Sequence, residues 1–382
     1  MSQGKVYNSK LSKTRDKDTE VEVIRLNHKE GNTVRPYFTQ PLFSQDGAFL
    51  LTASDRTGTW QLYNLEVKTG KMVQLTEESD LSPLTACLDG EKMKAYYWQD
   101  RSLKAVDLSN LKTETIYQVP DGFQPSILSL SSDGKYLDFS YSEKLNLSTV
   151  SGKIYSGMEE TFYQHPTSVV MRVDTEEKSA RAIWGERNWI SHVITSPVDS
   201  DIIVFCHEGP WHLVQRLWVV NAATHQVQPL FEQQKHFERA GHEIFTAGGR
   251  VMAQYGKRSQ LEEDWKNADL FIQPDGSCKE KFFYPGAKPM HVQVSSDEQH
   301  GVGDGAYLSP DFKAADQFMS LIKYEAGQAK MKLLCRHDNS WESQISHPHP
   351  VFTPDDQNVV FNSDREGKVN IYLAPADWEA LA

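Results

Sequence analysis

The sequence predicts an all-β fold, a seven-bladed β-propeller whose ring is closed by an N-terminal strand that completes the last blade. The first observation is an internal repeat, in which an apolar run leads into a small polar turn at intervals of roughly 50 residues. The second is that β-rich runs follow these turns, and the third is a spare strand-like run near the N-terminus. The repeated turns lie at residues 43–47, 87–90, 130–134, 195–199, 245–249, 294–297 and 352–356.

Each repeat is expected to supply the strands of one antiparallel blade. The clearest second runs lie at 48–52, 136–140, 201–205 and 358–362, and the clearest third runs at 60–64 and 217–221. The last repeat shows only three strands before Trp378, whereas the run Val21–Leu26 has no blade of its own. We therefore expect Val21–Leu26 to be the fourth strand of the final blade, because closing the ring removes exposed sheet edges.

Composition sets limits on the organisation of the chain. A propeller divides its core among its blades, so residues 1–382 are expected to form a single domain, with a polar N-terminal arm at 1–20. The polar start and the lack of an 18-residue apolar run argue against a signal peptide and a membrane span. Cys87, Cys206, Cys278 and Cys335 lack paired spacing, so we expect reduced, buried cysteines and a cytoplasmic protein.

The formal net charge of −12 bears on the partners of the chain. Such a charge argues against nucleic acid or an anionic membrane surface as a partner. It leaves room for a small anionic substrate, because a local cluster of metal, histidine and arginine dominates the field at one site.

Histidines recur at one position of the repeat. We number each repeated turn from one residue near its end, namely Asp46, Asp89, Asp133, Val198, Gly248, Asp297 or Asp355. The residue six positions before it is expected to begin the inner strand of its blade, at one mouth of the central channel. Four consecutive blades carry histidine there, which is improbable for a chain with 13 histidines. The residues at this position are Gln40, Pro83, Ile127, His192, His242, His291 and His349.

The segment Gln344–Pro350 carries three side chains that are able to bind a metal. Prolines at 348 and 350 disfavour helix for the residues before them, so we expect an extended segment that includes Ser346 and points His347 and His349 to the same side. Together with Gln344 they form a plausible half of a metal site. The structural alternative is that both histidines cap strand ends and that Gln344 only hydrogen-bonds the loop.

The loops between second and third strands should reach the same mouth. They carry His207, His212 and Arg216, and the Asp-Arg pairs that contain Arg56, Arg101 and Arg365. The candidate substrate-binding residues are His192, His212, Arg56 and Arg365. Structural ion pairs remain an alternative for the arginines, and Arg216 is expected on a strand face shared with His212. Two roles remain open for His192, namely substrate binding and support of another side chain of the site.

The Gln344-x-x-His347-x-His349 cluster, His291 at the start of the sixth blade and Gly241-His242-Glu243 in the fifth resemble the oligogalacturonate lyases, cytoplasmic enzymes of pectin breakdown. The resemblance runs from about Val21 to Trp378. It implies a divalent metal, most often Mn²⁺, held by His291, Gln344, His347 and His349. It also implies that His242 is the catalytic base and that Arg216 lies near a substrate carboxylate.

The chemistry that this resemblance implies suits these residue types. Short oligogalacturonates, saturated or unsaturated, would be cleaved by β-elimination to 4-deoxy-5-keto uronate, which requires removal of the C5 proton. A metal held by neutral imidazoles and an amide keeps its double charge for the carboxylate on C5. Imidazole, with an ordinary pKa of about 6.5, is a suitable base near neutral pH.

Two other function classes fit a propeller. One is a non-catalytic propeller that binds a protein or peptide at its mouth, as in translocation proteins. The other is a metal-dependent hydrolase or lactonase, whose sites favour carboxylate and asparagine ligands. The product separates the two enzyme classes, because elimination adds no water to the fragments.

Overall fold

The computed structural model describes residues 2–79, 81–148, 157–259, 265–286, 288–305 and 317–378. In these ranges nearly all regular structure is β-strand, which confirms the all-β expectation. Helical elements in the described ranges include α1 (Met158–Gln164) and the 3₁₀ turn η3 (Gln344–Ser346). None of the helices in the described ranges has the length and apolar character needed to cross a membrane.

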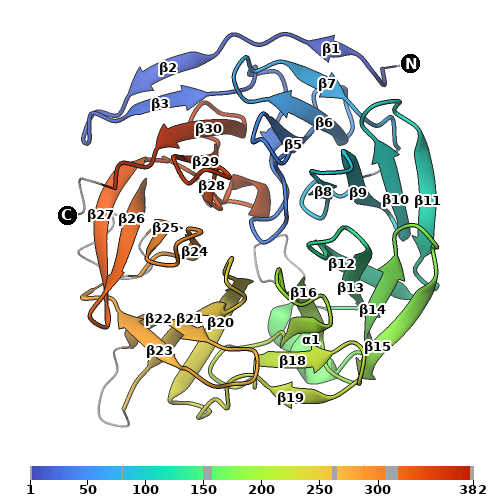
Figure 1. The fold of residues 1–382 in the computed structure, drawn as a ribbon, viewed down its shortest axis with the longest axis vertical. Helices are drawn as coiled ribbons and strands as arrows, with labels where there is room; N and C mark the ends of the chain where they lie inside the picture. Colours follow the sequence, from blue (N-terminus) through green and yellow to red (C-terminus); the bar gives the residue numbers. More distant parts are fainter. Residues whose placement is uncertain are drawn as a thin grey trace.

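The strands form sheets that are arranged around a central region (Figure 1). In most sheets the strand that comes first in the chain lies nearest to this centre. One five-stranded sheet has the order β1 (Val6–Tyr7), β7 (Met72–Gln74), β6 (Gln61–Glu66), β5 (Phe49–Ser54) and β4 (Thr33–Val34). The next has the order β11 (Thr113–Gln118), β10 (Ser102–Asp107), β9 (Lys94–Gln99) and β8 (Cys87–Asp89). A third contains β12 (Phe123–Leu130), β13 (Tyr136–Glu143), β14 (Ser168–Asp174) and β15 (Ala180–Glu186), in that order.

The remaining sheets complete the circle. One has the order β16 (Ile190–Thr195), β17 (Ile202–His207), β18 (Leu217–Asn221) and β19 (Val227–Pro229). The eight-stranded sheet has the order β20 (Glu238–Phe245), β21 (Val251–Lys257), β22 (Lys266–Ile272), β23 (Glu280–Phe283), β27 (Gln328–Arg336), β26 (Phe318–Glu325), β25 (His300–Asp304) and β24 (His291–Val294). The last has the order β2 (Ser12–Arg15), β3 (Glu22–Arg25), β30 (Asn370–Pro375), β29 (Asn358–Ser363) and β28 (Val351–Phe352).

Both ends of the chain meet in one sheet. Ile24 and Arg25 of β3 pair with Leu373 and Tyr372 of β30, and β2 pairs with β3 on the outside. The expected polar arm at 1–20 thus contributes β1 and β2, which lie along the rim of the ring (Figure 1). The eight-stranded sheet is two antiparallel groups of four strands, joined by the single parallel pair of β23 and β27.

The runs predicted from the repeat are strands. The second runs correspond to β5, β13, β17 and β29, and the third runs to β6 and β18. The expectation for the cysteines was wrong at one position, because Cys278 is exposed whereas Cys87, Cys206 and Cys335 are buried. Cys278 lies in the connection between β22 and β23, outside any strand, whereas the buried Cys87, Cys206 and Cys335 lie within strands.

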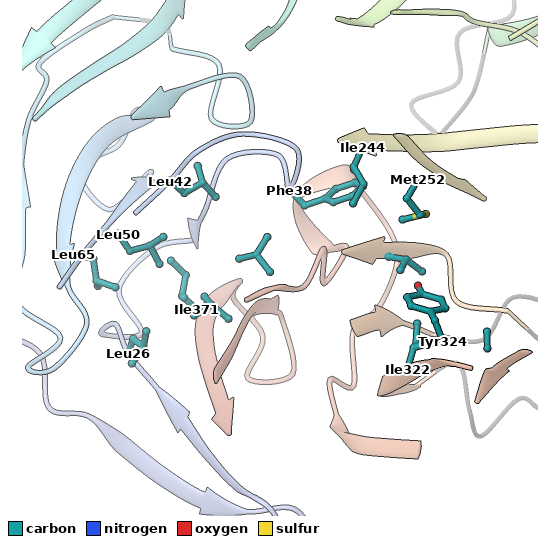
Figure 2. Close-up of a cluster of buried hydrophobic side chains, with 14 of the residues drawn as sticks. Leu26, Phe38, Leu42, Leu50, Leu65, Ile244, Met252, Ile322, Tyr324 and Ile371 are labelled. Atoms are coloured by element: carbon teal, nitrogen blue, oxygen red, sulfur yellow. The ribbon is translucent and has the colours of Figure 1, made fainter. Parts of the chain in front are cut away.

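A buried apolar cluster fills the space between sheets on one side of the ring (Figure 2). It brings Leu26 from the N-terminal segment against Ile371 of β30, so the two ends of the chain share one core. Phe38, which is 2% exposed, extends from the loop after β4 to Ile244 of β20 (Figure 2). Its ring also contacts the rings of His291 and His349, so this core supports the histidine cluster described below.

A buried ion pair between neighbouring strands of one sheet also contacts the next sheet. Arg172 of β14 donates from Nε and Nη2 to the two carboxylate oxygens of Asp138 on β13, both at 2.8 Å. Thr195 of β16 donates to the same carboxylate at 2.6 Å, and neither charged side chain is more than 1% exposed. The pair therefore holds β16, the inner strand that carries His192, against the preceding sheet.

We expect Arg172→Met to lower the free energy of unfolding by about 3–5 kcal/mol, because it leaves the buried carboxylate of Asp138 without its cation. Denaturant unfolding followed by far-UV circular dichroism measures this difference. Lys13→Met removes an exposed pair with Glu22, whose side chains are 59% and 48% exposed, and should cost less than about 1 kcal/mol. Equal effects of the two substitutions would contradict the assigned role of Arg172.

Candidate metal centre and active site

Three imidazoles from two separate segments converge beside the central region. His291 begins β24, whereas His347 and His349 follow η3, and one ring nitrogen from each lies within 4.8 Å of those of the other two. The ring of His291 lies 4.2 Å from that of His349 and 5.4 Å from that of His347. All three are at most 2% exposed, so they form a compact buried cluster.

The backbone of this segment differs from the extended conformation that the sequence predicted. Gln344–Ser346 forms the 3₁₀ turn η3, and the chain becomes extended only at His347, with φ −81° and ψ 138°. His349 has φ 46°, in the left-handed region. The prolines exclude an α-helix after His347 as expected, but the two histidines converge through a turn and a left-handed residue rather than through strand alternation.

The cluster has the properties of a divalent cation site. His347 Nδ1 and His349 Nε2 are buried and lack a hydrogen-bond partner among the described residues. Burial, together with the other histidines, lowers the pKa of His347 to about 4 and that of His349 well below its usual value. These imidazoles are therefore neutral near pH 7, and neutral imidazole nitrogens are ligands for Mn²⁺, Zn²⁺ and related ions.

Asp304 of β25 organises this cluster. Its carboxylate accepts hydrogen bonds from Nδ1 of His291 at 2.9 Å, from the backbone N–H of His291 at 2.8 Å and from the backbone N–H of His349 at 2.9 Å. Burial opposes the ionisation of Asp304, but His291 and these hydrogen bonds hold its pKa below the usual value. Because the ionised carboxylate only accepts, His291 donates from Nδ1 and keeps the Nε2 lone pair for a metal.

His242 lies next to the cluster, with its ring 4.5 Å from that of His291. The pairing of β20 with β21 shifts register between Gly241 and Ile244, and His242 has φ 48° within this bulge. A bulge turns a side chain away from the regular alternation of a strand, which here directs His242 to the cavity. Its Nδ1 donates to Oε1 of Gln254 at 3.2 Å, so Nε2 is left as a proton acceptor.

A cavity of about 230 Å³ adjoins these residues. It brings together five of the candidates from the sequence. They are His192, Arg216, His242, His291 and Gln344. Tyr37, Trp189 and Trp211 form aromatic parts of its wall, while Arg216, Glu208, Gln344 and the imidazoles supply the polar groups. A cavity with apolar and aromatic walls and a few polar groups is typical of a small-molecule site.

Arg216 is held by two carboxylates, the fully buried Glu243 and the partly buried Glu208. It donates from Nη1 to Glu208 at 2.8 Å and from Nε to Glu243 at 3.2 Å. His192 lies 3.6 Å from Glu208 and 3.5 Å from Glu243, and has φ 48° at a bulge of β16. The expected strand face shared by Arg216 and His212 was wrong, because residues 211–214 form a turn and β18 begins only at Leu217.

The Glu208 carboxylate gives this group a pH-dependent contribution to stability. Burial alone would raise its pKa, but the charges of Arg216 and His192 and the hydrogen bonds from Ser191 and Arg216 lower it to about 2. Since the folded pKa lies below the unfolded one, this contribution is complete above about pH 4.5 and is lost as pH falls towards 2.

For Glu208→Gln we expect unfolding free energy to fall by about 3 kcal/mol at pH 6, with the difference from the unsubstituted protein shrinking at pH 3. Denaturant titrations at both pH values test this. Glu114→Gln is the control, because Glu114 pairs with Lys178 while 42% exposed and should show almost no effect. A difference that stays constant between pH 6 and pH 3 would contradict the lowered pKa.

The structure does not bring all predicted residues to this cavity. Arg56 pairs with Glu30 and lies over the ring of Tyr7, and Arg365 donates to the backbone of Arg336 and lies over Tyr372. Neither Arg56 nor Arg365 is among the residues that line the cavity. His207 bonds to Glu186 at 2.7 Å and packs on Trp218, away from the cavity. His212 lines a second cavity that shares His242.

The fold and site therefore define an all-β enzyme whose ring of sheets surrounds a histidine-rich centre. The family model described as oligogalacturonate lyase matches residues 1–377. The chain belongs to the oligogalacturonate lyase family and is a lyase.

Similar proteins agree over the full length. The chain is 29% identical to an oligogalacturonate lyase of Dickeya dadantii, covering 98% of both chains, and 30% identical to an oligogalacturonide lyase of Pectobacterium atrosepticum, covering 94% of both. A solved oligogalacturonate lyase in complex with manganese superposes with a TM-score of 0.88 at 27% identity, covering 100% of both chains. The oligogalacturonate lyase of Vibrio parahaemolyticus gives a TM-score of 0.87 at 29% identity, with 98% of both chains covered.

Proposed function

We propose that this chain cleaves short oligogalacturonates such as digalacturonate by β-elimination, with His242 as the base and a divalent metal held by His291, Gln344, His347 and His349. The observation that carries the proposal is the position of His242, whose ring lies 4.5 Å from that of His291 on the wall of the shared cavity. The manganese complex of a similar enzyme supports Mn²⁺ as the metal.

The residues present fit such a metal. Three imidazoles present ring nitrogens within 4.8 Å of one another, and the rings of His347 and His349 each keep a buried nitrogen without a partner among the described residues. Gln344 lines the cavity that His291 also lines, which supports an amide as a further ligand beside the imidazoles. When bound there, a divalent ion would supply positive charge to a substrate carboxylate without neutralisation by its own ligands.

The reaction breaks the C5–H bond and the C4–O bond of one uronate and forms a C4–C5 double bond. We assign removal of the C5 proton to Nε2 of His242, because Gln254 occupies Nδ1. Arg216, fixed by Glu208 and Glu243, is assigned to the electrostatic stabilisation of the developing negative charge on the carboxylate. The leaving oxygen takes a proton, and cleavage of unsaturated digalacturonate yields two molecules of 4-deoxy-5-keto uronate.

We further infer that the fold is a seven-bladed propeller formed by residues 1–382 as one domain. Division of the eight-stranded sheet at its single parallel pair, into β20–β23 and β24–β27, supports seven units. Pairing of β3 with β30 supports closure of the ring by the N-terminal strand. Three buried free cysteines support the cytoplasm as the location.

The test is incubation of the purified protein with digalacturonate, after EDTA treatment and after restoration of Mn²⁺, with products followed by mass spectrometry. We expect turnover only with Mn²⁺ restored, and fragment masses that sum to that of the substrate without an added water. A product that carries an added water would favour a hydrolase. A lack of turnover with Mn²⁺ restored would favour a binding propeller.

A further inference from the structure

A second cavity, of about 330 Å³, adjoins the first and shares His242, Trp211 and Met158 with it. Its charged and ionisable lining groups are cations or imidazoles, and the rest of the lining is apolar or glycine. The lining residues are Met158, Gly209, Pro210, Trp211, His212, Arg239, His242, Lys288 and Met290. This set contains no carboxylate, although the chain carries a formal charge of −12. The cavity therefore favours an anionic ligand.

Lys288 is the most unusual member of this lining, because a lysine that is 5% exposed rarely lacks a carboxylate partner. Its Nζ donates to Oε1 of Gln254 at 2.7 Å and to the backbone oxygen of Pro289 at 3.3 Å. An ammonium group has three hydrogens, so one remains for a ligand in the cavity. Burial and the nearby Arg239 lower the pKa of Lys288 to about 7, and a bound anion would offset this cost.

The same oxygen of Gln254 connects Lys288 to the proposed base. Oε1 of Gln254 accepts from Nδ1 of His242 at 3.2 Å as well as from Lys288, and Nε2 of Gln254 donates to Pro289 at 2.7 Å. Because the Pro289 bond fixes which way the amide faces, Lys288 and Gln254 together hold His242 in the tautomer with a free Nε2.

Trp211 forms a flat wall where the two cavities meet. Its ring stands at 89° to that of His242, with the centroids 4.8 Å apart. The indole of Trp211 packs this closely against the backbone only because residue 241 is glycine, since a Cβ at that position would lie 2.6 Å from the indole. A sugar ring bound between Trp211 and Lys288 would thus meet an apolar face and a cation at once.

We propose that the second cavity binds the uronate that leaves, the sugar whose anomeric oxygen is released, and that Lys288 pairs with its carboxylate. This rests on the proposed function, in which the other uronate lies at the histidine cluster and loses its C5 proton to His242. Lys288 is then a specificity residue for the leaving sugar and, through Gln254, a positioning residue for the base.

The test compares two disaccharides with a galacturonate at the reducing end. One is digalacturonate, and the other has galactose in place of the leaving galacturonate, so that only the second carboxylate is missing. For the unsubstituted enzyme with Mn²⁺ we expect kcat/KM to favour digalacturonate by about tenfold or more, the size of one charge-assisted contact. For Lys288→Met we expect this ratio to fall to within about threefold of unity.

Control variants separate the charge of Lys288 from its packing. Lys288→Arg keeps the charge and should retain most of the preference, whereas Lys288→Gln should lose it. Lys281 is a half-buried lysine on the outer strand β23, and its Nζ lies over the ring of Tyr255. Lys281→Met should leave the ratio of the two kcat/KM values unchanged.

The outcomes distinguish the two proposals. If the unsubstituted enzyme eliminates neither disaccharide, the proposed function fails. If it cleaves digalacturonate but shows no preference, or if Lys288→Met and Lys288→Gln keep the preference, the assignment of the second cavity fails while the function stands.

Discussion

Replacement of His242 by glutamine is expected to lower kcat on digalacturonate by about 10²- to 10⁴-fold, the range for loss of a positioned general base. His242 is 6% exposed and its ring is fixed by Gln254. A water molecule therefore does not take over its role as the base unless the site rearranges. Glutamine keeps a polar side chain of similar reach but does not accept a proton at neutral pH. KM should change far less than kcat, because the substrate carboxylate contacts assigned to Arg216 and the metal remain.

His207→Gln is the matched control for this substitution. His207 is also buried, at 7% exposure, and also has a hydrogen-bonded ring, but its partner is Glu186 and it lies outside the cavity. We expect it to keep kcat within about threefold of the original, as measured by steady-state assays of both variants at saturating Mn²⁺. A His242→Gln enzyme with kcat as high as that of His207→Gln would exclude His242 as the base.

Spacing in the sequence predicted that His192, His242, His291 and His349 share one position of a repeat, whereas His347 was identified from the proline-containing segment that includes it. His192, His242 and His349 all have φ between 46° and 48°, so the shared position corresponds to a shared local conformation. A repeat turns sequence spacing into spatial position, and therefore His291 and His349 meet although they belong to separate segments. The same reasoning failed for Arg56 and Arg365, since equivalent loops were assumed to reach the centre and both side chains pack at their own sheets instead.

The supporting residues could not be predicted in this way. Asp304, Gln254 and Lys288 act through hydrogen bonds to residues 13, 12 and 34 positions away, and these depend on strand pairing rather than on local pattern. Glu243 was visible beside His242, but its pairing with Arg216 follows from a bulge that the sequence does not reveal.

Asp304→Asn is expected to weaken Mn²⁺ binding by about 10- to 100-fold, the usual cost of removing the partner of a metal-binding histidine. The amide retains the shape of Asp304 but carries no negative charge, and its nitrogen is unable to accept the hydrogen bonds that the carboxylate accepts. His291 is then free to adopt the other tautomer, and the backbone of His349 loses an anchor at 2.9 Å. Isothermal titration of the metal-free protein with Mn²⁺ measures the change directly, independent of activity.

Asp269→Asn provides the control for burial. Asp269 is also fully buried, but it accepts from Tyr284 and Tyr324 rather than from a histidine, and burial raises its pKa to about 6. Its replacement should leave Mn²⁺ affinity within about threefold of the original. If Asp304→Asn binds Mn²⁺ as tightly as Asp269→Asn, the carboxylate does not orient His291 towards the metal. If both lose affinity equally, the effect comes from general loosening of the buried sheets.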